Sequence, residues 1–475
     1  MDDTGVRELV VIGGGPGGYP AAFYAADLGM DVTLIDLEAN PGGVCLYRGC
    51  IPSKALLHAA AVLGEAQHAH EFGITFGEPT LDVGKLRSWK QSVVDKLTGG
   101  LGQLAKSRKV HYIQGRARFV DGTSLVVARQ DGSEETIRFK TALLATGSRP
   151  ARIPIAPESP LVMDSTGALN LEDVPERLLV IGGGYIGLEL GQAYAAFGSK
   201  VSVVEMLPQL MAGADADLVK PLLTKLGKQF EAIMVETRVE AIEAGATDVT
   251  VRMQDRDGKS IVETYNRVLI SVGRKPNTSD LGLEKTKVQV DKQGFVVTNA
   301  QRQTNETSIF AIGDIAGQPM LAHKATYEGK IAVEAISGRR SVYDPAAIPA
   351  VVFTDPEIAW TGLTESEARE AGLDIQVSKF PWAASGRSTT LGRSDGLTKL
   401  LADRETGRVL GVGITGPGAG EMIAEGTLAI EMGAVAQDLA QTIHAHPTLS
   451  ETVMEAAEGI LGHATHFVAK KTQKT

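Results

Sequence analysis

The two cysteines of this 475-residue chain, Cys45 and Cys50, lie five positions apart in the segment GGVCLYRGCIPSK at 42–54. Glycines before and between them, and a proline after the second, are typical of a tight loop that opens a helix. A thiol at a helix N-terminus is stabilised as the thiolate, and two close thiols can form a strained, reducible disulfide. The spacing therefore predicts a redox-active pair. Two buried cysteines that never react remain the alternative.

Two glycine-rich segments echo each other along the chain. Each follows a short apolar run, opens a helical pattern and leads to a β-branched strand that ends on an acid. The glycines are Gly13, Gly15 and Gly18 in the first copy and Gly182, Gly184 and Gly187 in the second. Such glycines let the backbone approach a pyrophosphate at a helix N-terminus, and the acid binds ribose hydroxyls. Two copies predict two dinucleotides, with electron transfer between them.

The acids that close the two units are Asp36 and Glu205. Glu205 would repel a 2′-phosphate, and the residues after it, Met206-Leu207-Pro208, offer no arginine to receive one. The second unit is therefore predicted to bind NAD rather than NADP.

The elements that must position these groups follow from the apolar periodicity. Helices are predicted from Ala21 to about Gly29, from Leu188 to about Gly198, and through the charged stretch 59–109. Turn signals at 121–122 and 131–132 predict hairpins, and the segments 143–150 and 269–277 read as matching crossovers that leave a nucleotide domain. A strand at 309–314 delivers Asp314 to a loop. Beyond Pro349 the pattern changes to mixed strands and helices without a third phosphate loop.

The length, net charge and N-terminal residues of the chain limit the kinds of protein that it can be. A chain this long predicts about three domains. The net charge of −10 disfavours nucleic acid as a partner, and no stretch reaches the roughly 18 apolar residues of a membrane span. The acidic start Met1-Asp2-Asp3 is unlike a secretory signal, so we expect a cytoplasmic protein. In that reducing compartment a lone cysteine pair is more often redox-active than structural. The tail 470–474 is expected to be frayed.

Together these segments resemble the pyridine nucleotide–disulfide oxidoreductases, and within them the bacterial branch that oxidises dihydrolipoamide. The matching segments are the first glycine loop, GGVCLYRGCIPSKALLH at 42–58, ATGSRP at 145–150, GGGYIGLELG at 182–191, GRKPNT at 273–278, AIGDIAGQPMLAHKA at 311–325, FTDPEIAWTGLTE at 353–365 and HAHPTLSE at 444–451. The cysteine segment and the final segment are the most specific.

The resemblance implies an α/β fold with two Rossmann-like dinucleotide-binding domains and an α+β C-terminal dimerisation domain. The expected order is an FAD-binding domain at 1–149, an NAD-binding domain at 150–276, a central segment at 277–348 that returns to the FAD domain, and an interface domain at 349–475. Members of the family are homodimers in which the interface domain of one subunit completes the active site of the other.

The resemblance also implies the reaction. Dihydrolipoamide on a lipoyl domain would lose a proton to His446 and attack the Cys45–Cys50 disulfide at Cys45, with Cys50 on the flavin side. Electrons would pass to FAD and then as hydride to NAD⁺. Imidazole suits the base because it titrates near neutral pH, and Glu451 can orient the ring. A structural histidine beside a proline turn is the alternative, and His444 is interpreted as secondary. The lipoyl domains would belong to the dihydrolipoyl acyltransferase core of a 2-oxo acid dehydrogenase complex, or to the glycine cleavage system.

Cofactor contacts are expected from the matching positions, and no metal site is predicted. The FAD contacts are Gly13, Gly15, Gly18, Asp36, Gly43, Lys54, Ala117, Thr146, Gly147, Asp314 and Ala322. The NAD contacts are Gly182, Gly184, Tyr185, Ile186, Gly187, Glu189, Glu205, Val239 and Gly273. Ala117 would offer backbone to adenine, and Asp314 would bind the ribityl chain. Lys54 follows Cys50 by one helical turn, where its charge favours a thiolate. Glu189 is its expected partner, although an ordinary surface salt bridge is the alternative.

The chain departs from the family pattern at two places, and each departure leads to a hypothesis. Many relatives have Asn-Val where this chain has Tyr47-Arg48, and Arg48 is expected to tune the stability of the thiolate or the docking of an acidic lipoyl domain. Tyr185 is an aromatic residue where the branch often has an aliphatic one. It would either stack over the flavin and gate the entry of nicotinamide, or only pack.

Rival functions lack one of these features. Glu205 argues against an NADPH-dependent glutathione reductase, and a mercuric reductase needs a further cysteine pair near the C-terminus, which the sequence does not contain. A soluble transhydrogenase or NADH oxidase would lack the cysteine pair or the H-P-T-x-x-E base motif. A non-catalytic flavoprotein that serves as a binding subunit has no reason to keep all of them.

Overall fold

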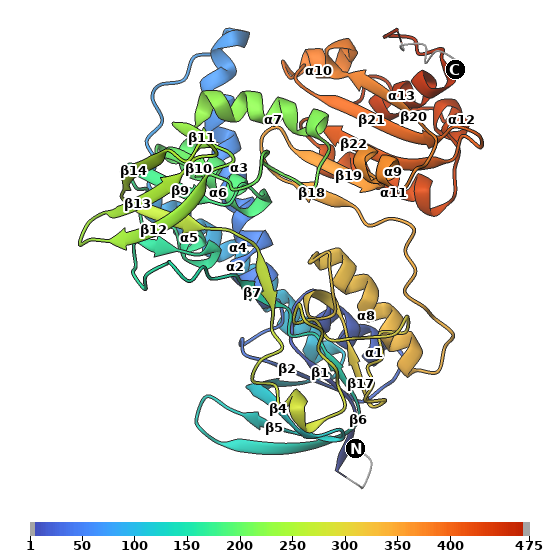
Figure 1. The fold of residues 1–475 in the computed structure, drawn as a ribbon. Helices are drawn as coiled ribbons and strands as arrows, with labels where there is room; N and C mark the ends of the chain where they lie inside the picture. The colour runs from blue at the N-terminus through green and yellow to red at the C-terminus, as the bar shows by residue number, and fades with distance from the viewer. Residues whose placement is uncertain (1–4, 469–475) are drawn as a thin grey trace.

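The computed structural model describes residues 5–468 and confirms the predicted α/β class, with two mainly parallel sheets and a separate antiparallel sheet. In Figure 1 the first sheet lies at the bottom, the second at the upper left and the antiparallel one at the upper right. Among the described residues no helix is both long enough and apolar enough to cross a bilayer. The predicted frayed tail at 470–474 falls outside the described residues.

The first sheet has the order β3-β2-β1-β6-β5-β4, and β17 also pairs with β6. Its strands are β1 (Val6–Ile12), β2 (Val32–Asp36), β3 (His111–Gln114), β4 (Arg116–Asp121), β5 (Ser124–Ala128), β6 (Glu134–Leu144) and β17 (Ile309–Ala311). The pairs that β1, β2, β3, β6 and β17 make with one another are parallel, whereas β4, β5 and β6 are joined by the predicted hairpins. Helices α1 (Gly18–Asp27) and α8 (Ala322–Ile336) pack on each other and on this sheet.

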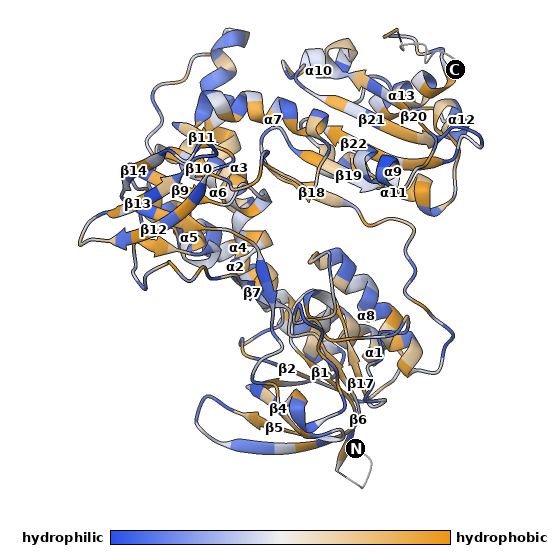
Figure 2. Cartoon of the chain, in the orientation of Figure 1, coloured by the Kyte–Doolittle hydropathy of each residue, from blue (hydrophilic) through white to orange (hydrophobic). Residues whose placement is uncertain are grey.

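The second sheet is wholly parallel, in the order β11-β10-β9-β15-β8. Its strands are β8 (Val162–Met163), β9 (Arg177–Ile181), β10 (Lys200–Val204), β11 (Ala232–Met234) and β15 (Arg267–Ile270), and its helices are α5 (Ser165–Asn170), α6 (Tyr185–Phe197) and α7 (Ala216–Gln229). Alternating blue and orange along α7 in Figure 2 marks an amphipathic helix, and its leucines at 218, 222 and 226 are buried. An antiparallel ribbon of β12 (Arg238–Ala244), β13 (Val249–Gln254) and β14 (Ser260–Tyr265) accompanies the sheet.

The two predicted crossovers meet each other. Strand β7 (Ser148–Pro150) pairs antiparallel with β16 (Arg274–Pro276), where the chain leaves the first nucleotide unit and where it returns from the second. The two units are therefore joined by one short ribbon as well as by helix packing.

The third sheet is antiparallel, in the order β18-β19-β22-β21-β20. Its strands are β18 (Ala350–Val352), β19 (Ile358–Gly362), β20 (Ile375–Pro381), β21 (Leu397–Asp403) and β22 (Val409–Thr415). Its helices are α9 (Glu365–Glu370), α10 (Gly386–Thr390), α11 (Ala419–Glu431), α12 (Ala436–Gln441) and α13 (Glu451–Leu461). Trp382 is fully buried in the core between the sheet and these helices. This part has the predicted α+β composition.

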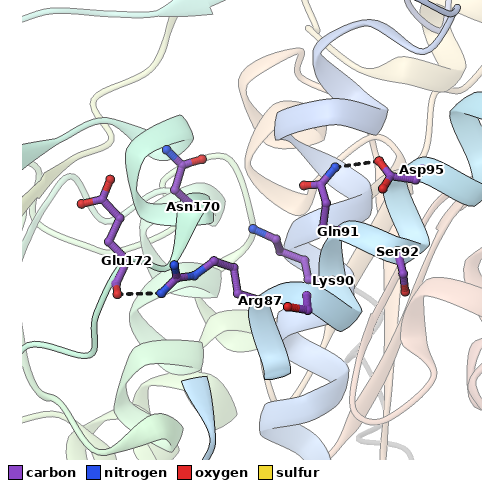
Figure 3. Close-up of a pocket in the computed structure, with 8 residues that line it drawn as sticks. Arg87, Lys90, Gln91, Ser92, Asp95, Asn170 and Glu172 are labelled. Atoms are coloured by element: carbon purple, nitrogen blue, oxygen red, sulfur yellow. Dashed lines mark hydrogen bonds between the residues drawn. The ribbon is translucent and has the colours of Figure 1, made fainter. Parts of the chain in front are cut away.

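Three helices link the first sheet to the second. They are α2 (Gly43–Arg48), α3 (Cys50–His68) and α4 (Val83–Ser107), and a break at 69–82 divides the helical stretch predicted for 59–109. Helix α4 is hydrogen-bonded to the end of α5: Arg87 donates to the Leu171 and Glu172 carbonyl oxygens at 3.0 and 2.8 Å, and the buried Lys90 donates to that of Leu169. Figure 3 shows the bond from Arg87 to Glu172. Cations at a helix C-terminus are favourable, so this contact fixes α4 against the second unit, and α4 packs on α3, which begins with Cys50.

Candidate active site

The cysteines lie in two consecutive helices rather than in a loop. Cys45 is the third residue of α2, and Cys50 is the first residue of α3. Gly49 separates the helices, and a Cβ there would come within 2.9 Å of the Val44 carbonyl oxygen. Glycine thus permits the tight junction that sets the two thiols face to face. Both cysteines are free thiols in the structure.

The two thiols differ in acidity. The hydrogen bond from Cys45 lowers the pKa of Cys50 to about 7, and the charge of Lys54 acts in the same direction, against the opposing effects of burial and Glu189. The same hydrogen bond, together with burial, raises the pKa of Cys45. In the dithiol Cys50 is therefore the sulfur that ionises first.

Lys54 and Glu189 form the predicted ion pair, with Nζ 2.8 Å from Oε2. The Glu189 side chain is 4% exposed, so the pair is more than a surface salt bridge. The other carboxylate oxygen accepts the Phe353 backbone N–H at 2.9 Å, and the Lys54 ammonium also lies 4.3 Å from the centre of the Phe353 ring. The pair thus joins α3, α6 and the segment between β18 and β19.

His446 and Glu451 form the predicted dyad. Nδ1 of His446 lies 2.9 Å from Oε1 of Glu451, whose other oxygen accepts the Thr448 N–H at 2.7 Å. Burial pushes the pKa of Glu451 upward, but these hydrogen bonds outweigh it and hold that pKa below its usual value. The His446–Pro447 peptide is cis, and the His446 side chain is 79% exposed. Within residues 5–468 no hydrogen bond engages Nε2, so that nitrogen is available to a substrate.

His444 is held differently from its neighbour. Its Nε2 lies 2.7 Å from the Glu425 carboxylate and its Nδ1 lies 2.8 Å from the Thr442 carbonyl oxygen. With both ring nitrogens engaged and its side chain 5% exposed, His444 anchors the loop before α13 against α11. This supports its interpretation as secondary.

The first glycine loop has the geometry that a dinucleotide needs. Gly13 has φ +105°, and a Cβ there would lie 2.3 Å from the Ala145 carbonyl oxygen. A Cβ on Gly43 would lie 2.4 Å from the Cα of Gly15, so the two backbones approach as only glycines can. Asp36 accepts the Gly14 N–H at 2.5 Å, which turns its carboxylate toward the loop. This cradle at the start of α1 fits the diphosphate and ribose of FAD.

The second glycine loop repeats the first. Gly182 has φ +107°, and a Cβ there would lie 2.6 Å from the Ser271 carbonyl oxygen. Glu205 accepts the Gly183 N–H at 2.7 Å, as Asp36 accepts that of Gly14. A Cβ on Gly187 would lie 2.4 Å from the Gly182 carbonyl oxygen, so α6 packs tightly on its own loop, Gly184 and Ile186 included. The donor set fits NAD.

The two positions expected near adenine are equivalent in the structure. The Gly115 N–H donates to the Asp36 carbonyl oxygen at 2.8 Å, and Ala117 follows two residues later on β4. The Thr237 N–H donates to the Glu205 carbonyl oxygen at 3.0 Å, and Val239 follows two residues later on β12.

Asp314 lies against the first crossover. It accepts a hydrogen bond from Ser148, whose hydroxyl in turn accepts one from Arg274 at 2.7 Å. The crossover is closed by Asn277, which bonds the Thr146 carbonyl oxygen through its side chain at 2.9 Å and that of Gly147 through its backbone at 2.9 Å. The remaining expected contacts are Gly273, which has φ +109° before β16, Ala322, the first residue of α8, and Gly18, the first residue of α1.

Tyr185 begins α6 and is 38% exposed. Burial raises the pKa of its hydroxyl to about 12, and the charges of Glu189, Cys50 and Asp314 add to the shift. Tyr185 therefore lies between the NAD loop and the residues expected around the flavin.

Arg48 makes an ion pair that the sequence did not predict. Its guanidinium forms an ion pair with Glu38, and its charge lowers the pKa of Asp36 against the effect of burial. The pKa values of Cys45 and Cys50 respond to each other and to Lys54.

The structure does not bring His446 to the cysteines. Within residues 5–468 no hydrogen bond joins the dyad to Cys45 or Cys50. Figure 1 shows the start of α13 in the third sheet's part of the molecule, away from α2. Phe353, Ser148 and Arg274 were missed from the sequence as site residues, although FTDPE, ATGSRP and GRKPN contain them.

The chain belongs to the pyridine nucleotide–disulphide oxidoreductase family, whose sequence profile matches residues 7–329, while the family's dimerisation domain matches residues 348–457. The protein uses FAD and NAD as cofactors. The chain is 47% identical to dihydrolipoyl dehydrogenase of Vibrio parahaemolyticus over 468 residues, and 47% identical to that of Geobacillus stearothermophilus over 464 residues, with 98% of each chain covered in both comparisons.

Solved structures agree with this assignment. LpdA of Mycobacterium tuberculosis superposes with a TM-score of 0.88 at 27% identity, and the match covers 95% of this chain and 99% of that one. The HOCl-induced flavoprotein disulfide reductase RclA of Escherichia coli superposes with a TM-score of 0.84 at 30% identity, with the same coverage.

Proposed function

We propose that this protein oxidises protein-bound dihydrolipoamide to lipoamide and reduces NAD⁺, as a dihydrolipoyl dehydrogenase. The observation that carries the proposal is the pair of free thiols that face each other at the junction of α2 and α3, with Lys54 one helical turn from Cys50, because a disulfide exchanger needs one sulfur that meets substrate and one that leaves as a stabilised thiolate. The full-length identity to dihydrolipoyl dehydrogenases supports the choice of substrate.

The side chains of the site have separate roles in the reaction. His446 takes a proton from one substrate thiol at Nε2, while Glu451 holds Nδ1. The substrate thiolate attacks Sγ of Cys45 in the oxidised enzyme, which forms a substrate–Cys45 disulfide, breaks the Cys45–Cys50 bond and releases Cys50 as a thiolate. The second substrate thiol then displaces Cys45, which leaves lipoamide and a dithiol that carries both electrons. Lys54 stabilises the negative charge on Cys50.

Bound FAD supplies the two-electron acceptor between this dithiol and NAD⁺. Gly13, Gly15, Gly43 and Asp36 would hold its adenosine diphosphate, and Asp314 its ribityl chain. Gly182, Gly184 and Glu205 would hold NAD⁺, and Tyr185 would cover the place where nicotinamide enters.

We also propose that the enzyme is a homodimer in which His446 of the partner subunit serves the cysteines of this one. The exposed His446 ring and its separation from Cys45 within one chain support this arrangement, as does the dimerisation-domain match. The proposed domain boundaries remain 1–149, 150–276, 277–348 and 349–475. The partners would be the lipoyl domains and acyltransferase core of a 2-oxo acid dehydrogenase complex, in the cytoplasm.

An NAD⁺-linked assay tests the proposal. The purified protein is given dihydrolipoamide, or a dihydrolipoylated lipoyl domain, and NADH formation is compared with the rate of glutathione reduction by NADPH. We expect rapid, NAD⁺-specific oxidation of the lipoyl substrates. Dominant NADPH-driven reduction of glutathione would overturn the proposal, as would full activity in Cys45→Ser.

A further inference from the structure

Arg48, at the end of α2, is paired with an acid at the adenosine side of the first glycine loop. Its guanidinium forms an ion pair with Glu38, and the two side chains are 36% and 27% exposed. Glu38 follows Asp36 by two residues, and its own N–H donates to the Asp36 carboxylate at 2.9 Å. Arg48 is therefore fixed beside the acid that faces the ribose of FAD.

The segment 37–42, between β2 and α2, is fastened by neighbouring side chains as well. The Tyr47 hydroxyl donates to the Asn40 carbonyl oxygen at 3.1 Å, and the Tyr112 hydroxyl donates to the Glu38 carbonyl oxygen at 2.8 Å. Tyr47 and Arg48 are the two residues at which this chain departs from the family's usual Asn-Val. Both contact the segment 37–42, Tyr47 at Asn40 and Arg48 at Glu38.

Arg48 supplies a positive charge next to the carboxylates of Asp36 and Glu38. Asp36 and Glu38 place two carboxylates beside the site of a diphosphate, and like charges at close range oppose binding. Burial raises the pKa of Asp36, and the positive charge of Arg48 opposes that rise. Arg48 therefore offsets negative charge where a dianionic cofactor must bind.

We propose that Arg48 is a retention residue for FAD: it neutralises Glu38 and ties α2 to the segment that carries Asp36. The inference rests on FAD as the cofactor of the proposed enzyme, but it concerns binding of the adenosine diphosphate and not the thiol chemistry.

The test measures the release of FAD. Holoenzyme is diluted and the rise of free-flavin fluorescence is followed, and apoprotein is titrated with FAD. We expect Arg48→Val to bind FAD about tenfold more weakly at low salt, with a smaller difference at high salt because screening weakens the interaction. Arg48→Lys, which keeps the charge, should recover most of the affinity.

A double variant separates charge from folding. Arg48→Val combined with Glu38→Gln should restore FAD affinity to within about twofold of the wild type, because the unpaired carboxylate is gone. Arg108→Val, which breaks the Arg108–Asp27 pair elsewhere in the first unit, is the matched control and should release FAD at the wild-type rate.

Three outcomes overturn the inference. They are normal FAD affinity in Arg48→Val, equally weak binding in the double variant, and an equal loss in Arg108→Val. Failure of the proposed function would look different. In that case the wild-type protein would hold FAD tightly yet would not oxidise dihydrolipoamide.

Discussion

Glu189 shares its carboxylate between Lys54 and the backbone of Phe353. One oxygen lies 2.8 Å from the Lys54 ammonium, and the other accepts the Phe353 N–H at 2.9 Å. Because Lys54 is one helical turn from Cys50, this buried acid fixes the position of the cation that stabilises the thiolate.

Replacement of Lys54 should make Cys50 less acidic. The pKa of Cys50 is lowered to about 7, so its thiolate forms as the pH rises through neutrality. In Lys54→Met we expect this transition to move up by about 1 unit or more, since an opposite charge has been removed. The pH dependence of alkylation of the reduced protein by iodoacetamide measures the shift. Lys85→Met, on the exposed start of α4, is the control, and an unchanged profile in Lys54→Met would contradict the assignment.

His446 should be needed as a base and Glu451 as its positioning residue. His446→Gln is expected to lower kcat for dihydrolipoamide oxidation by roughly 10²–10⁴-fold. Glu451→Gln should lower it less, and should also move the acidic limb of the pH–rate profile, because the charge behind the imidazole is lost. His463→Gln, at an exposed histidine that follows the other end of α13, is a matched control. A wild-type rate in His446→Gln would mean that another group takes the proton.

Subunits that are inactive alone should complement each other. In a mixture of Cys45→Ser and His446→Gln chains, each heterodimer would contain one intact site if the partner supplies the histidine. Activity should therefore appear after co-expression and be absent from either variant alone. Absence of recovery in isolated heterodimers would show that the cysteines and His446 act within one chain.

Glu205 should determine the choice of nucleotide. Its carboxylate accepts the Gly183 N–H at 2.7 Å and the Leu207 N–H at 2.8 Å, which aims the charge at the ribose position. In Glu205→Gln the preference for NAD⁺ over NADP⁺, measured as the ratio of kcat/KM values, should fall about tenfold or more, equivalent to roughly 1.4 kcal/mol. An unchanged ratio would indicate that discrimination lies elsewhere in the pocket.

Tyr185 should affect nicotinamide more than stability. Its place at the start of α6, between the NAD loop and Cys50, predicts that Tyr185→Ile changes the KM for NAD⁺ and the flavin fluorescence. Tyr185→Phe keeps the ring and should change them little. Comparable KM values and fluorescence in Tyr185→Ile would favour simple packing.

The sequence was sufficient for the architecture because glycine loops and apolar periodicity are local signals. Gly13 and Gly182 stand after strands and before helices, and the structure builds equivalent loops from them, each tied to its acid through the next glycine. The hairpins at 121–122 and 131–132 follow from turn residues in the same way.

What the sequence missed depends on contacts between distant segments. The short helix that contains Cys45 could not be predicted, since a six-residue helix gives little periodic signal. The pairing of Arg48 with Glu38 joins the end of α2 to the loop before it, and no local pattern in the sequence indicates that contact. The link from Glu189 to Phe353 crosses 164 positions and involves a backbone N–H, which has no residue signature.

The hydrogen bonds between α4 and α5 affect how nucleotide-binding units can be exchanged between related proteins. Arg87 and Lys90 bind three backbone carbonyls at the end of α5, so they recognise the shape of the chain there rather than its side chains. A nucleotide-binding unit from a relative could therefore be grafted after the first unit with little sequence matching at this junction, provided that its first helix ends in the same place. Glu189, by contrast, would have to be transferred together with Lys54 and Phe353, the two residues that it binds.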